Sequence, residues 1–268
     1  MTRSPLATGR PPARLLAPAA VGLAFLALPL VGLLIRAPWA TLADRLQDPS
    51  VVQALRLSLV TASTATLVSL LVGVPLAWVL ARTNVPGRSL VRAFITLPLV
   101  LPPVVGGLAL FLSLGREGYA GKVIDDWFGI TLPFTTAAVV LAQIFVAMPF
   151  LVISVEGALR ATDSRYDEAA ATLGASGWRT FTKVTVPLSL PGIVAGAVLG
   201  WARALGEFGA TIMFAGNFPG KTQTMPLKVF LALQTDPDAA IVLSLVLLAV
   251  SITVLAALRD RWLTGASV

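Results

Sequence analysis

The stretch LSLVTASTATLVSLLVGVPLAWVLA, residues 57–81, carries no charged side chain. A helix that crosses a bilayer needs about 20 predominantly apolar residues, so this stretch is long enough to span a membrane once. Charge-free windows of this kind occur six times along the chain, at residues 15–35, 57–81, 93–115, 131–155, 184–202 and 239–258. The sequence therefore predicts an all-α integral membrane protein with about six transmembrane helices.

The composition of the chain agrees with a membrane environment. Of its 268 residues, 56% are hydrophobic and 12% are charged, and that charged share is about half that of a soluble domain. Two of the windows are expected to depart from a simple span. Pro98, Pro102 and Pro103 predict that the third window is kinked or unwound, and the fifth, which is the shortest, is expected to continue through Arg203 and Glu207.

Two missing residue types exclude several kinds of chemistry. The chain contains no Cys and no His. Disulfides, metal sites built on Cys or His, and acid–base catalysis by His are therefore excluded. We predict no catalytic residue, no metal site and no cofactor in this chain, and we expect that it is not an enzyme.

Positive charge is distributed unevenly among the segments that join the windows. With the N-terminus placed in the cytoplasm, twelve Lys and Arg residues fall on inner segments and seven on outer ones. The acidic residues leave the outer segments neutral and the inner ones at +7, which is the whole formal excess of the chain. Because Lys and Arg are typical of cytoplasmic loops, both termini are expected to be cytoplasmic. This orientation explains the basic charge without nucleic acid as a partner.

The windows also predict how the chain is divided. Residues 1–14, which are rich in Pro and Arg, are expected to form a disordered basic tail in the cytoplasm. Residues 15–262 are expected to form one transmembrane domain, followed by a short tail at 263–268. The first window follows a basic lead, as in a signal peptide, but its apolar stretch exceeds the usual 7–15 residues. We interpret it as a retained helix.

A polar loop at residues 157–187 separates the fourth window from the fifth on the inner side. Asp163 or Ser164 is predicted to cap a short helix, and Ser164 with Asp167 resembles a capping box. Gly174 suits the position after a helix end that requires a positive φ. The first half of the loop therefore predicts one short, well-terminated helix.

The second half of the loop predicts another short helix. Ser176 is placed to cap it, and Trp178, Phe181 and Val184 follow. Pro187 and Pro191 then mark the entry to the fifth window. Because isolated helices this short are marginal in water, both are expected to need something on which to dock.

The loop resembles a known motif. Its fixed positions are Glu168, Ala169, Ala170, Gly174, Val184, Val186 and Pro187. In order and spacing they are similar to the "EAA" loop of permeases of ABC importers. The resemblance implies a type I importer permease fold in which this cytoplasmic loop supplies a coupling helix that sits in a cleft of the ATPase subunit. Asp167 and the motif residues Glu168, Ala169, Ala170, Gly174 and Pro187 are thereby assigned to ATPase coupling.

The fifth window carries a row of small residues followed by two charges. Gly192, Gly196 and Gly200 recur every four residues, so another helix can approach closely along that face. Arg203 and Glu207 continue roughly the same face and are spaced to pair. Charges at membrane depth are costly and usually face a bundle interior or a watery path. Two interpretations remain open, namely a translocation path or gate and an ion pair that anchors the bundle.

A second resemblance extends from Arg203 to Pro226. The stretch RALGEFGATIMFAGN, residues 203–217, and the following PGKTQTMP resemble the permeases for molybdate, tungstate and sulfate, and look most like the molybdate permease. This likeness implies import of a tetrahedral oxyanion, with molybdate as the favoured cargo and sulfate or tungstate as alternatives. It assigns Gly196, Gly200, Arg203, Glu207 and Thr211 to the translocation path or gate.

The resemblance also implies partners and a location. Permeases of this kind work as a pair, so a second copy of the chain, two copies of an ABC ATPase and an extracytoplasmic oxyanion-binding protein are expected. ATP and Mg²⁺ would be held by the ATPase. The implied location is the plasma membrane, or inner membrane, of a bacterium or archaeon.

Two other classes of function were weighed. A channel or secondary transporter would be expected to carry more ionisable groups within the spans, together with inverted repeats. An intramembrane enzyme would need paired acids, His or Cys in the spans. The loop GNFPGKT, residues 216–222, is one residue short of a P-loop. ATP hydrolysis is therefore expected to require a partner.

Overall fold

The computed structural model describes residues 13–264, and in that range the chain is helical and contains no strand. Five helices are long and apolar enough to cross a membrane or contain such a segment: α1 (Ala13–Ile35), α3 (Pro49–Arg82), α7 (Thr136–Ala161), α10 (Val186–Leu205) and α13 (Pro237–Thr264). The tails were expected at residues 1–14 and 263–268; residues 1–12 and 265–268 lie outside the described residues, and residues 13–14 and 263–264 belong to α1 and α13.

The third predicted window forms a broken element. It is divided into α4 (Arg88–Val100) and α5 (Pro103–Leu114), whose axes differ by 116°. The break lies at Leu101 and Pro102, which have extended backbone angles and so cannot continue the helix. The kink predicted from the prolines is therefore confirmed, and the pair counts as a sixth span if its two halves are taken together.

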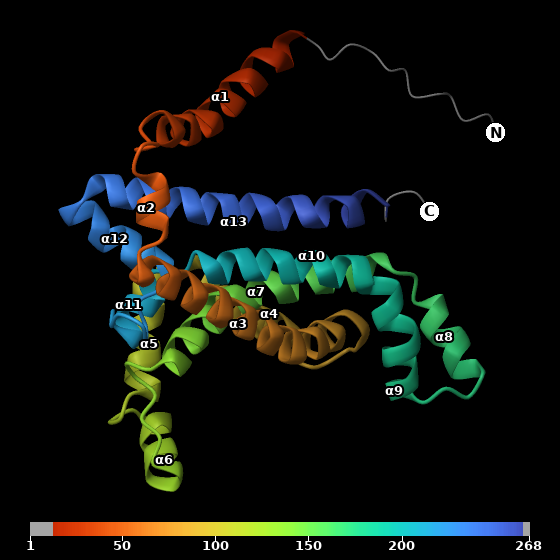
Figure 1. The fold of residues 1–268 in the computed structure, drawn as a ribbon. Coiled ribbons are helices and arrows are strands. Elements are labelled where there is room, and N and C mark those ends of the chain that lie inside the picture. The colour runs from red at the N-terminus through yellow and green to blue at the C-terminus, as the bar shows by residue number, and fades with distance from the viewer. Residues whose placement is uncertain (1–12, 265–268) are drawn as a thin grey trace.

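Shorter helices lie at the two ends of the bundle (Figure 1). Those near one end are α2 (Leu42–Leu46), α6 (Tyr119–Phe128), α11 (Gly209–Ala215) and α12 (Met225–Thr235). Those at the opposite end are α8 (Arg165–Thr172) and α9 (Gly177–Thr180), and a π-helical segment, η1 (Phe181–Thr185), joins α9 to α10. The polar loop predicted from sequence therefore forms one end of the molecule.

The centre of the bundle is formed by α3, α7 and α10, which all pack against one another. One buried cluster joins the three helices through apolar side chains, namely Ala77, Leu80, Leu151, Val152, Val155, Leu159 and Ile193. By contrast, α1 lies apart from this bundle (Figure 1), and its apolar segment has no buried residue. An apolar helix exposed in this way needs lipid or another protein to cover it.

The face of α10 that carries Gly192 lies directly on α7. A Cβ at Gly192 would collide with the Cβ of Ala158, and one at Gly196 would lie 3.1 Å from the Cβ of Ser154. At Gly200 the nearest atom would be 3.7 Å away, on the backbone of Ala147. The close helix approach predicted from the small residues is confirmed, and the helix approached is α7 of the same chain.

We predict that Gly192→Ala destabilises the bundle. The added methyl group meets a short, rigid side chain, and overpacking of this kind typically costs about 1–3 kcal/mol. Thermal unfolding in detergent should therefore occur at a lower temperature. Gly157→Ala on α7 is the matched control, because a Cβ at Gly157 meets nothing within 4 Å. An equal effect of the two substitutions would contradict the packing argument.

Candidate functional site

The first half of the polar loop forms α8, and its end has the geometry expected from the sequence. Gly174 adopts a left-handed φ of +81°. Its N–H donates to the carbonyl of Ala171, and the N–H of Ala175 donates to that of Ala170. These two bonds form a Schellman motif, which satisfies the last carbonyls of a helix. Glycine is needed here because a side chain would be strained at this φ.

The start of α8 differs from the predicted capping box. The hydroxyl of Ser164 makes no capping hydrogen bond. Instead, the carboxylate of Asp163 accepts a hydrogen bond from the backbone N–H of Arg165, at 3.0 Å. Asp167 cannot complete a capping box, because its carboxylate is engaged elsewhere.

The second half of the loop is continuous with the fifth span. Ser176 caps α9 as predicted, since its hydroxyl accepts from the N–H of Arg179 at 3.3 Å. However, α9 is followed without a break by η1 and then α10. The prediction of a separate second helix is therefore wrong. Pro187 causes no break because it lies in the first turn of α10. A displacement of α9 therefore acts directly on a transmembrane helix.

Asp167 ties α8 to two other elements. Its Oδ2 lies 3.2 Å from Nε of Arg82 at the end of α3, and its Oδ1 accepts from the hydroxyl of Thr185 in η1 at 2.8 Å. Arg82 also donates to the carbonyl of Thr162, just beyond α7, at 2.9 Å. One carboxylate thus joins the loop to the ends of α3 and α10. Sequence reasoning chose Asp167 but did not identify Arg82 or Thr185 as its partners.

Other side chains of the loop face outward. Glu168 and Ala169 are exposed, whereas Ala170 is partly buried. Large apolar side chains are exposed as well, with Leu173 at 88% and Trp178 at 74%. Exposed apolar groups gathered on an ordered loop mark a surface that another protein can cover. The predicted contacts of these residues with an ATPase stay a prediction.

The predicted pair of charges forms just after α10. Nη2 of Arg203 lies 2.7 Å from Oε2 of Glu207, whose side chain is 1% exposed. The second carboxylate oxygen accepts from the N–H of Ala210 in the first turn of α11, at 2.8 Å. Glu207 lies beyond the helix, because α10 ends at Leu205, so the expected extension through Glu207 is wrong. Its carboxylate instead connects α10 to α11.

The remaining path candidates are buried within the bundle. The next residue of α11, Thr211, is fully buried, and its hydroxyl has no hydrogen-bond partner within the described residues. Both polar atoms of the fully buried Gln143 on α7 are likewise unpartnered in this part of the chain. Gly196 and Gly200 face α7. The assignment of these predicted residues to a translocation path stays a prediction.

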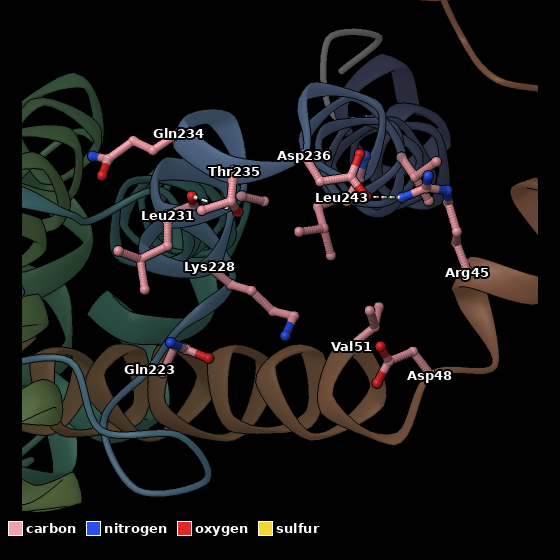
Figure 2. A pocket seen from close by; sticks show the side chains of 13 residues that line it. Arg45, Asp48, Val51, Gln223, Lys228, Leu231, Gln234, Thr235, Asp236 and Leu243 are labelled. Atoms are coloured by element: carbon pink, nitrogen blue, oxygen red, sulfur yellow. Dashed lines mark hydrogen bonds and ion pairs between the residues drawn. The ribbon is translucent and has the colours of Figure 1, made fainter.

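The largest cavity described lies at the end of the bundle opposite α8, and the sequence did not indicate it. Its volume is about 500 Å³, and its lining comes from α2, α3, α12, α13 and the loop before α12. Figure 2 shows Lys228 reaching into it from α12, while Arg45 and Asp236 meet at its edge, 2.6 Å apart. The hydrogen bond from Arg45 holds the pKa of Asp236 below its usual value. Its lining includes two acidic residues, Asp48 and Asp236, and two basic ones, Arg45 and Lys228, so the lining has no net formal charge.

Among the side chains described at residues 14–254, no group of three or more acidic residues lies together in a way that could hold a metal ion. The expectation that the chain binds no metal or cofactor stays a prediction.

Residues 73–265 match the family described as "Binding-protein-dependent transport system inner membrane component". The chain belongs to this family. The family describes a membrane component of a transport system, so the prediction of a multi-pass transport subunit rather than an enzyme is confirmed.

Two sequence relatives and one solved structure illustrate what the chain is similar to. The chain is 49% identical to the "Molybdenum transport system permease protein ModB" of Mycobacterium tuberculosis, over 91% of this chain and 92% of that protein. It is 38% identical to the "Probable sulfate transport system permease protein cysT" of Chlorokybus atmophyticus, over 86% and 82%. A crystal structure of a bacterial alginate ABC transporter, in complex with an alginate pentasaccharide-bound periplasmic protein, superposes with a TM-score of 0.71 and 18% identity, covering 93% of this chain and 94% of that one. That superposition confirms the predicted ABC importer permease fold.

We predict that Asp167→Ala loosens the loop. Losing the hydrogen bond and ion pair of a charged group costs about 1.5–3 kcal/mol, so the population of the open loop should rise roughly tenfold or more. Tryptic cleavage at Arg165, Arg179 and Lys183, followed by mass spectrometry, measures this change. Glu168→Ala is the control, because the neighbouring Glu168 carboxylate has no ion pair among the side chains described at residues 14–254. Equal cleavage of both variants would contradict the role of Asp167.

Proposed function

We propose that the chain is the membrane-spanning subunit of an ATP-driven importer that carries molybdate into the cytoplasm by alternating access. The observation that carries the proposal is the 49% identity with a molybdenum transport permease over nine tenths of the chain. The identity with a sulfate permease is lower, at 38%. Sulfate and tungstate, which share the tetrahedral oxyanion chemistry, are therefore the alternative cargoes.

The orientation follows from the loop and the charges together. The end that carries α8 and α9 holds most of the inner basic residues, and such residues are typical of the cytoplasmic side. In Figure 1, α13 runs back toward this end. We therefore place the loop at 157–187 and both termini in the cytoplasm, and the cavity of Figure 2 on the extracytoplasmic side.

In this proposal, the exposed and the inward faces of the loop play different parts in coupling the ATPase to the transmembrane helices. Glu168, Leu173 and Trp178 are exposed and would contact an ABC ATPase, which binds ATP and Mg²⁺. Asp167 faces inward and joins α8 to Arg82 and Thr185. Closure of two ATPase copies would displace α8, and the ion pair would carry that displacement to α3 and α10. The two end states of the importer would then differ by a rigid-body motion.

A second copy of the chain completes the pathway in this proposal. The apolar segment of α1 has no buried residue, and a second copy could cover part of it while lipid covers the rest. An extracytoplasmic oxyanion-binding protein would deliver the cargo to the outer end. The superposable alginate transporter was solved with a periplasmic protein, which supports this arrangement.

The test of the cargo is ATP-dependent uptake in liposomes that hold this chain with its ATPase and binding protein. We expect molybdate to accumulate, and excess sulfate not to suppress its uptake. Uptake of sulfate as fast as that of molybdate would overturn the assignment of molybdate as the cargo. Flux without ATP would overturn the proposal of an ATP-driven importer and favour a channel or secondary transporter.

A further prediction separates the two interpretations of Arg203 and Glu207. Arg203→Met leaves the buried carboxylate of Glu207 unpaired, which should cost about 3–5 kcal/mol. The double variant Arg203→Met with Glu207→Gln removes both charges and retains an acceptor for the N–H of Ala210. If the pair lines the path, thermal stability should recover in the double variant and uptake should not. Recovery of both would mean that the pair only anchors the bundle.

A further inference from the structure

Three arginines converge on one buried carboxylate near the loop end of the bundle. Glu156 lies on α7, and its side chain is 8% exposed. Arg160, one turn further along α7, places Nη2 at 2.8 Å from Oε1 of Glu156. Arg92 on α4 donates to the same oxygen, and Nη2 of Arg88 lies 3.9 Å from it. We call these four residues the Glu156 cluster.

The Glu156 cluster has a net formal charge of +2, because three guanidinium groups share one carboxylate. The other acids described at this end do not make up the difference. Asp167 pairs with Arg82, and Asp163 lies 3.9 Å from Arg165. Glu168 has no ion pair among the side chains described at residues 14–254 and lies exposed on α8. The described residues therefore leave the cluster with unmatched positive charge.

The arginines also retain unused hydrogen-bonding capacity. Nε of Arg88 is buried and has no hydrogen-bond partner within the described residues. A guanidinium carries five N–H donors, and Oε1 of Glu156 receives contacts from all three arginines. Their side chains remain 29%, 40% and 46% exposed for Arg88, Arg92 and Arg160. An anion arriving from outside can therefore reach donors that Glu156 does not occupy.

An apolar surface adjoins these arginines on α4. Arg88 and Arg92 are one helical turn apart and turn toward α7. Val91 and then Phe94 continue around the helix from Arg88 and are 37% and 66% exposed. In a membrane protein, exposed apolar side chains of this kind contact acyl chains. Positive groups and an acyl-chain surface thus lie side by side at the end of a span.

From this arrangement we propose that the Glu156 cluster binds the phosphate of an anionic phospholipid headgroup, whose acyl chains lie along α4 beside Val91 and Phe94. Guanidinium groups bind phosphate oxygens through paired N–H donors. Basic pockets between transmembrane helices are suited to anionic headgroups. A free phosphate ion would satisfy the arginines but would gain nothing from the exposed Val91 and Phe94, which is why the lipid is the favoured source.

The bound phosphate would have a structural consequence. Glu156 and its arginines join α4 to α7, and α4 leads into the break before α5. An anion that neutralises the excess charge would reduce repulsion among the arginines and hold α4 against α7. Placing the lipid in the cytoplasmic leaflet rests on the proposed function, whereas the lipid contact itself does not.

The experiment uses the assembled complex of permease and ATPase and counts bound lipid by native mass spectrometry. The probes are dioleoyl-phosphatidylglycerol, which is anionic, and dioleoyl-phosphatidylcholine, which has no net charge. We expect selective retention of phosphatidylglycerol. In Arg88→Gln and Arg160→Gln its affinity should fall roughly fivefold for each arginine removed. Arg165→Gln, an exposed arginine on α8, is the matched control and should retain the lipid.

Several results would overturn the proposal. They are equal retention of the two lipids, equal effects of Arg160→Gln and Arg165→Gln, and displacement of phosphatidylglycerol by millimolar inorganic phosphate. Retention by the permease alone that disappears when the ATPase binds would assign the cluster to a protein contact. If a variant fails to fold, the two-lipid comparison and the phosphate competition on the unaltered chain still decide. Uptake in liposomes is scored separately, so a failed cargo assignment leaves the lipid result unchanged.

Discussion

The close approach of α10 to α7 is the contact on which the rest of the structure depends. In hydrocarbon there is no hydrophobic force between helices, so association relies on packing and on polar contacts. Gly192 provides that packing where a methyl group would collide with Ala158. With α3 added, the three helices form the central core. The elements at both ends of the bundle are held in place by this core.

Polar contacts are concentrated where the helices of this core end. Asp167 joins α8 to α3 and η1, and the Glu156 cluster joins α4 to α7. Near the start of α11, Glu207 connects that helix with α10. Because charges are costly at membrane depth, each of these three carboxylates is paired with a partner from another turn or another helix. Small rigid-body shifts of the core would alter these contacts first, and this makes them suited to a protein that alternates between two states.

The two ends of the molecule differ in chemistry. The end with α8 exposes apolar side chains on an ordered loop and carries an excess of basic residues. At the opposite end, a cavity is lined by a balanced set of acids and bases from α2, α3, α12 and α13 (Figure 2). A subunit that meets an ATPase on one side and a cargo-delivering protein on the other would need such different surfaces.

The sequence by itself determined the features that depend on neighbours along the chain. Hydropathy predicted the spans, the prolines predicted the break between α4 and α5, and Gly174 and Ser176 predicted a helix end and a helix start, because all of these are set within a few residues. It failed at Glu207, where Gly206 ends the helix. Only the tertiary structure decided the partners of Asp167, the Glu156 cluster and the pairing of Arg45 with Asp236 across 191 positions. Such pairs form because packing of the spans brings distant helix ends together, and no local pattern encodes that.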